Sequence, residues 1–135
     1  GVIRRSIAGG GIFRLLLCWQ AGTGLPLLIH AVKKREELIA LKKRIKPENA
    51  WIIHGFRGKK ELAESLVRQG FYLSFGEKYQ VEALQAVPAD RLLLETDEDL
   101  PIEELYWLAA RQRNIGVEQL VSEIQETTGL LFFNQ

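Results

Sequence analysis

The chain has 135 residues, of which 47% are hydrophobic and 26% are charged, enough for one soluble domain with its own core. Its 18 Lys and Arg nearly balance its 17 Asp and Glu. This balance excludes a global positive field that would hold nucleic acid, so any such contact must be local. No apolar run approaches the length of a membrane span.

The N-terminal residues 1–24 have no regular pattern. Residues 9–11 are three glycines, which predict a flexible break, and residues 13–19 are apolar without a clear amphipathic period. We therefore expect residues 1–24 to be an irregular segment, followed by a domain over residues 25–135. Arg14 interrupts the apolar stretch, which argues against a secretory signal.

Cys18 is the single cysteine, so no internal disulfide can form, and we expect a reducing, cytoplasmic setting. The chain begins with Gly1 and contains no Met. We expect it to be trimmed or a fragment.

Strand and helix patterns alternate four times from Leu25 onward. The predicted strands are 27–30, 51–54, 71–75 and 91–95, and the predicted helices are 34–45, 60–69, 80–86, one opened by Pro101, and 117–125. The positions expected to face inward include Leu38, Leu41, Ile45, Ile102, Leu105, Leu108 and Ala109. This alternation predicts an α/β fold of about four parallel βα units with right-handed crossovers.

Three apolar runs lead into side chains that can bind metal. Leu25–His30 and Trp51–His54 end in histidines, and Arg91–Asp97 ends in a carboxylate. Continuous apolar runs are typical of buried parallel strands, and in barrels of such strands catalytic groups lie at the C-terminal ends. The three side chains are therefore expected to meet at one site.

The segments GLPLLIH, WIIHGFRG, GFYLSFGE and DRLLLETD resemble, in order and spacing, the C-terminal half of the TatD family of metal-dependent deoxyribonucleases. The resemblance covers roughly residues 25–132. It implies that the chain is the C-terminal half of a TIM (β/α)8 barrel, a hydrolase with a divalent metal that cleaves phosphodiester bonds.

By this resemblance His30, His54 and Asp97 are metal ligands. Imidazole is the commonest protein ligand for transition metals. The alternative for each histidine is a hydrogen-bonded residue at a strand end. Imidazole with carboxylate suits Zn, Mn, Fe or Ni, and also Mg where the site is rich in oxygen, so we expect a divalent metal such as Mg, Mn or Zn.

Glu95 and Asp97 lie two residues apart, so both carboxylates are on the same side of the strand end. Asp97 is expected to orient or deprotonate an attacking water, and Glu95 to steer a ligand or a backbone group. The alternative for such an acidic cluster is capping of the next helix, and Glu98 and Asp99 fit that role better.

Arg57 stands where the family usually has Ser or Thr. Its guanidinium could bind a substrate phosphate bidentately, or it could be a surface cation that pairs with a carboxylate. Glu77 follows a predicted strand, and we expect it to support or line a loop.

The family's metal centre also uses a His-x-His motif and a Glu that lies in a Gly-Glu-x-Gly-Leu-Asp segment. Neither the motif nor this segment is present among the 135 residues, which contain two histidines. We therefore expect a DNase-type hydrolase of impaired activity. The alternatives are a non-catalytic remnant or a half-barrel that binds a partner. The charge balance disfavours a small nucleic-acid-binding module. Four strands would leave an open sheet with two unpaired edges, which predicts self-association.

Overall fold

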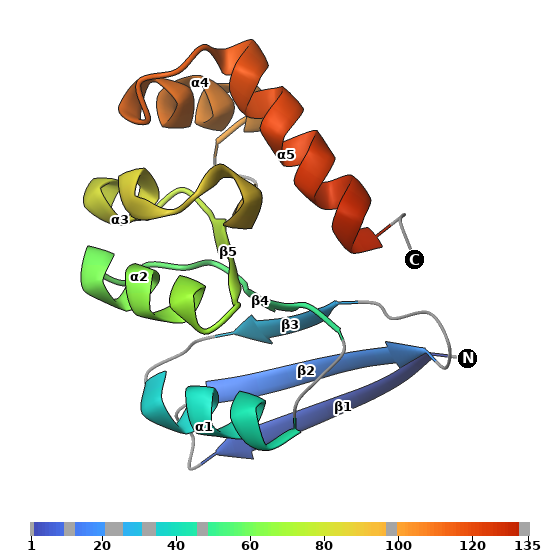
Figure 1. The fold of residues 1–135 in the computed structure, drawn as a ribbon. Helices are drawn as coiled ribbons and strands as arrows, with labels where there is room; N and C mark the ends of the chain where they lie inside the picture. Colours follow the sequence, from blue (N-terminus) through green and yellow to red (C-terminus); the bar gives the residue numbers. More distant parts are fainter. Residues whose placement is uncertain are drawn as a thin grey trace.

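The computed structural model describes residues 2–9, 13–20, 26–30, 35–45, 49–96 and 100–132. Six strands form one sheet in which the strand order follows the chain (Figure 1). The strands are β1 (Val2–Gly9), β2 (Phe13–Gln20), β3 (Leu27–His30), β4 (Trp51–Ile53), β5 (Tyr72–Phe75) and β6 (Leu92–Leu94).

The four strands from β3 to β6 pair in parallel, and helices connect them, as the sequence predicts. The helices are α1 (Arg35–Ile45), α2 (Lys60–Arg68), α3 (Val81–Ala86), the short 3-10 helix η1 (Ala89–Arg91), α4 (Ile102–Gln112) and α5 (Val117–Phe132). The last helix extends beyond its predicted end at residue 125. Among the described residues, no helix is both long enough and apolar enough to cross a membrane.

The N-terminal segment differs from the prediction of an irregular stretch. β1 pairs with β2 antiparallel over their whole length, from Val2 opposite Gln20 to Gly9 opposite Phe13. β2 then pairs antiparallel with β3, with Leu16 opposite Leu28. The ladders with β1 and with β3 pair backbone polar groups of β2 without requiring any amphipathic period in its side chains. The proposed domain limit at residue 25 stays a prediction.

This hairpin corrects the expectation that the parallel strands themselves form both unpaired edges of the sheet. The β3 edge of the parallel strands is paired with β2. Among the described residues, the sheet therefore ends at β1 on one side and at β6 on the other.

The core lies between the helices and one face of the parallel strands. Alternate strand residues on this face are buried, among them Ile29, Ile53, Leu73, Phe75 and Leu92. They form one cluster with helix residues that include Leu38, Ala63, Leu66, Leu84, Ala109 and Leu120. Because side chains alternate along a strand, the residues between them point to the other face of the sheet.

Two predicted core positions are exposed instead. Ile45 is 53% exposed at the last residue of α1, and Leu108 is 43% exposed on α4. The buried face of α4 runs through Leu105, Ala109 and Ala110. At about 100° per residue, Leu108 lies on the far side of Leu105 from Ala110 and so points away from the core.

Two helices end in the same backbone motif. After α2, Gly70 has φ +89°, its N–H donates to the carbonyl of Val67, and the N–H of Phe71 donates to that of Leu66. After α4, Asn114 has φ +60° and the N–H of Ile115 donates to the carbonyl of Ala110. Both are Schellman motifs, and Gly70 directly follows residue 69, the predicted end of its helix.

Candidate metal and catalytic site

The C-terminal ends of the parallel strands are aligned by their register. Ile29 is opposite Ile53, which is opposite Leu73 on the next strand. Continuing each pairing by one residue places the backbone of His30 beside His54, and His54 beside Ser74. The N–H of His54 donates to the carbonyl of Ile29 at 2.8 Å, which fixes the backbone at this point.

The candidate residues on β4, β5 and β6 share one face of the sheet. Ser74 is opposite Leu93 in the ladder between β5 and β6. Glu95 follows Leu93 by two residues, so it points to the same face. Its N–H donates to the carbonyl of Phe75 at 2.9 Å, which keeps the strand end attached to β5. His54, Ser74 and Glu95 thus come from three neighbouring strand ends.

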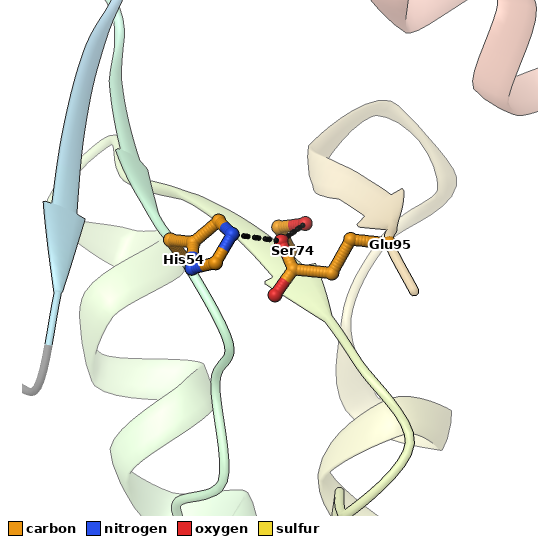
Figure 2. Close-up of polar contacts among 3 residues, drawn as sticks. All are labelled: His54, Ser74 and Glu95. Carbon is orange, nitrogen blue, oxygen red and sulfur yellow. Dashed lines mark hydrogen bonds and ion pairs between the residues drawn. The ribbon is translucent and has the colours of Figure 1, made fainter. Parts of the chain in front are cut away.

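The three side chains meet at the carboxylate of Glu95 (Figure 2). Nε2 of His54 lies 3.0 Å from Oε2 of Glu95, and Oγ of Ser74 donates to the same oxygen at 2.7 Å. The His54 side chain is 42% exposed and that of Glu95 is 22% exposed. The site is therefore open on the histidine side, while Ser74, at 6% exposed, is buried beneath it.

This contact has a defined chemical consequence for His54. A neutral imidazole has one N–H, and it must be on Nε2 if it donates to Glu95. Nδ1 then has the lone pair. A carboxylate on one ring nitrogen while the other nitrogen faces a metal is the usual arrangement of a metal-binding histidine.

Glu77 links the loop after β5 to the segment that follows Glu95. Its Oε1 accepts a hydrogen bond from the N–H of Leu100 at 2.9 Å and lies 3.1 Å from Oγ1 of Thr96. The Thr96 hydroxyl is also 2.6 Å from the carbonyl of Leu100. Because the hydroxyl has one proton, it can donate to only one of these acceptors at a time. Glu77 thus supports a loop, as the sequence indicated.

Arg57 is exposed in the loop between β4 and α2. Its backbone carbonyl accepts a hydrogen bond from Nε2 of Gln80 at 3.0 Å. This bond joins the loop after β4 to the start of α3, so the backbone that presents the guanidinium is supported from the neighbouring unit.

Two of the predicted metal ligands cannot be placed. His30 is the last residue of β3, and the structure describes its backbone but not its side chain. Asp97 lies outside the described residues. Within the described part of the chain, no group of three or more His, Cys, Asp or Glu could hold a metal ion. Of the predicted ligands, His54 is thus the one whose side chain is described, with Glu95 behind it as a hydrogen-bonding partner.

Ser74 is the site residue that sequence reasoning missed. It lies within the apolar strand β5, and a buried hydroxyl needs a hydrogen-bond partner. That isolated polar position was the available signal. Its partner could not be identified from the sequence, because Glu95 lies 21 residues further along the chain.

Comparison with known proteins gives a consistent family. The model of the TatD related DNase family matches residues 11–130. YabD of Bacillus subtilis, named an uncharacterized metal-dependent hydrolase, is 33% identical over 94 residues, which are 64% of this chain and 37% of the relative. The 3'-5' ssDNA/RNA exonuclease TatD of Erwinia tasmaniensis is 30% identical over 95 residues, which are 63% and 36% of the two chains.

Solved structures show the same fold at low identity. A hydrolase of the TatD family from Entamoeba histolytica superposes with a TM-score of 0.72 at 15% identity, over 82% of this chain and 52% of that one. The TatD homologue YJJV of Escherichia coli has a TM-score of 0.69 at 21% identity, over 80% and 50%. The chain therefore spans about half of these structures, which fits a partial α/β barrel.

The family match covers most of the chain, and the parallel strands, their order and the similar solved folds agree with it. This chain belongs to the TatD related DNase family.

Proposed function

We propose that this chain is part of a divalent-metal-dependent hydrolase that cleaves phosphodiester bonds, as a DNase does. The observation that supports this most directly is the contact between His54 and Glu95 at the C-terminal ends of parallel strands. Such strand ends are where barrel enzymes assemble their active sites. The family match extends on both sides of these residues.

In this proposal His30, His54 and Asp97 hold the metal. The backbone of His30 continues the register that places it beside His54, which is consistent with two histidines on neighbouring strands. Asp97 follows Glu95 by two residues. A bound Mg, Mn or Zn would stabilise the negative charge that develops on the phosphoryl group.

Glu95 and Asp97 are the proposed catalytic carboxylates. Glu95 holds His54 through Oε2, and Asp97 would orient or deprotonate the attacking water. Both tasks need ionised carboxylates. The hydrogen bond from Ser74 fixes the position of Oε2, the oxygen that contacts His54.

Arg57 is the proposed substrate-binding residue. It is exposed and is three residues beyond His54, so a phosphate group bound near His54 would lie within reach of a long guanidinium side chain. A planar guanidinium matches two phosphate oxygens at once. The relative from Erwinia tasmaniensis is named an ssDNA/RNA exonuclease, which supports DNA or another phosphodiester as the substrate class.

We further propose that this chain alone is impaired. It spans 37% and 36% of the two curated relatives described above, and the His-x-His motif of the family is not among its residues. The alternative is a non-catalytic half-barrel that binds a partner, including a second copy through an open sheet edge. Cys18, the single cysteine, is the reason for keeping the cytoplasm as the proposed compartment.

Titration calorimetry with Mn²⁺ and Zn²⁺ tests the metal site, with His54→Ala as the comparison. Stoichiometric binding that is lost in His54→Ala would support the proposal. Equal heats for both proteins would contradict it. Light scattering after size-exclusion chromatography tests self-association, and a compact monomer would exclude it.

Cleavage of end-labelled single-stranded DNA tests the reaction itself. The comparison variant is Arg57→Lys, which keeps the positive charge but loses bidentate geometry. Weaker apparent binding of DNA by Arg57→Lys, with metal binding unchanged, would support a phosphate contact. If Arg57→Lys and Arg57→Ala both bind DNA like the parent chain, Arg57 is a surface cation.

A further inference from the structure

Within the described residues, the two side chains that contact the carboxylate of Glu95 act on a single oxygen. Ser74 Oγ is 2.7 Å and His54 Nε2 is 3.0 Å from Oε2 of Glu95. In Figure 2 dashed lines join the imidazole of His54 and the hydroxyl of Ser74 to the carboxylate of Glu95, and the three residues come from neighbouring segments of the sheet. The place of Oε2 is therefore set by two groups on two different strands.

Ser74 is better fixed than either of the groups it joins. Its residue is 6% exposed, whereas the His54 and Glu95 side chains are 42% and 22% exposed. Its backbone is held within β5, and its carbonyl accepts the N–H of Phe56 at 2.9 Å. A short bond from a hydroxyl to a carboxylate is among the stronger kinds of hydrogen bond. The buried hydroxyl of Ser74 can thus hold the carboxylate of Glu95 in one position.

The other oxygen of Glu95 lies where two glycines leave room. A Cβ at Gly55 would be 3.4 Å from Oε1, and a Cβ at Gly76 would be 3.7 Å from the same atom. These glycines follow His54 and Phe75 directly. The carboxylate is therefore close to the backbone on the Oε1 side and bonded to Ser74 on the Oε2 side, which limits its rotation.

We propose that Ser74 is a positioning residue that acts on His54 through Glu95. Its hydroxyl holds Oε2 so that the carboxylate keeps the imidazole of His54 in one orientation, with the proton on Nε2. The part of this inference that concerns metal binding rests on the proposed function, in which His54 is a ligand. The part that concerns the imidazole is independent of it.

The first test uses the 135-residue chain without metal. Nitrogen-15 NMR of the imidazole rings reports which ring nitrogen has the proton, and the chain has two histidines, so a His30→Gln variant assigns the spectrum. At fixed neutral pH, we expect His54 of the parent to show mainly the Nε2–H form and Ser74→Ala to show a mixture. An unchanged His54 spectrum in Ser74→Ala would overturn the inference.

The second test is the affinity for Mn²⁺ and Zn²⁺. Loss of a partner behind a metal ligand commonly weakens binding by about 10- to 100-fold, and we expect roughly the lower end for Ser74→Ala. Ser74→Thr, which keeps the hydroxyl, should restore most of the affinity. Ser65→Ala on α2 is the matched control and should have no effect. An equal loss in Ser74→Thr and Ser74→Ala would overturn the role of the hydroxyl.

The two tests separate the two proposals. If the parent chain binds no metal but Ser74→Ala still alters the His54 spectrum, the proposed function fails and the positioning role stands. Circular dichroism checks the fold of each variant. If Ser74→Ala does not fold, Ser74→Cys replaces it, because its thiol is of similar shape but donates weakly.

Discussion

Glu77 accepts the backbone N–H of Leu100, which lies 23 residues further along the chain. The bond is 2.9 Å long, and the same oxygen also contacts the hydroxyl of Thr96. One carboxylate in the loop after β5 is therefore attached to both ends of the short stretch that follows Glu95.

We predict that Glu77→Ala weakens metal binding more than Glu77→Gln does. Alanine removes the acceptor for Leu100, whereas glutamine retains a carbonyl oxygen. An unsatisfied buried N–H costs about 1–3 kcal/mol, and the exposed side of this loop reduces the cost toward the lower value. Calorimetry of Mn²⁺ binding and denaturant unfolding measure the two effects. Equal values for both variants would contradict the role of the Leu100 bond.

Arg113 is predicted to support the end of α3. Its Nη1 donates to the carbonyls of Leu84 and Val87, each at 2.7 Å. Desolvation lowers the pKa of Arg113, and the charge of Glu123 partly opposes that shift. Arg113→Met should fill similar space while leaving both carbonyls without this donor, at a cost of about 1–3 kcal/mol. Urea unfolding measures it, and Arg111→Met on the exposed side of α4 is the control.

The burial of two tyrosines predicts a loss of stability in alkali. Desolvation raises the pKa of Tyr79 and of Tyr106 above the ordinary value of 10.0. The unfolded chain then releases these protons at a lower pH than the folded chain does. The stability they contribute is complete below about pH 10 and is lost as the pH rises through the folded pKa values.

Denaturant unfolding at several alkaline pH values tests this slope. The Tyr79→Phe variant loses a hydrogen bond to Gln112, so it should be less stable near neutrality. Above about pH 10 its stability should fall less steeply than that of the parent, because one proton fewer is released. Parallel slopes for the two proteins would contradict the raised pKa.

Two glycines should respond to alanine in opposite directions. Gly70 has φ +89° at the end of α2, so Gly70→Ala should destabilise the fold by about 1 kcal/mol. Gly129 is inside α5 and has open space where a Cβ would be, so Gly129→Ala should stabilise it by about 0.5–1 kcal/mol. Thermal unfolding compares them, and a stabilising Gly70→Ala would be inconsistent with the Schellman motif.

The parallel half of the fold could be predicted from local patterns. The apolar runs around Ile29, Ile53 and Leu73 have the composition of buried strands, and Gly70 marks a helix end. These features depend on neighbouring residues, so a single sequence contains the information. The strand ends predicted that His30, His54 and Asp97 meet, which stays a prediction, and gave Glu95 the role of steering a ligand or a backbone group.

The N-terminal strands and the contact of Ser74 with Glu95 depend on pairing between residues that are far apart in the sequence. The strand at Phe13–Gln20 forms because β1 and β3 lie on its two sides. Its own sequence has no regular alternation of apolar and polar residues that would predict a strand. The bond between Ser74 and Glu95 needs the register of β5 and β6. The end of α4 uses Asn114 in the left-handed region, which is less easily recognised than glycine.

The antiparallel pairing of β2 with β3 has a consequence for any chain that would complete this barrel. A closed barrel of this family type needs a parallel strand on each side of every strand. A partner that approaches β3 would have to displace β2 and its three aligned residue pairs, Arg14 with His30, Leu15 with Ile29 and Leu16 with Leu28. The N-terminal hairpin is thus an intramolecular competitor for the same hydrogen bonds. Completion of the site at His54 would begin with an exchange of strands at this edge, while β6 could accept a new strand by simple addition.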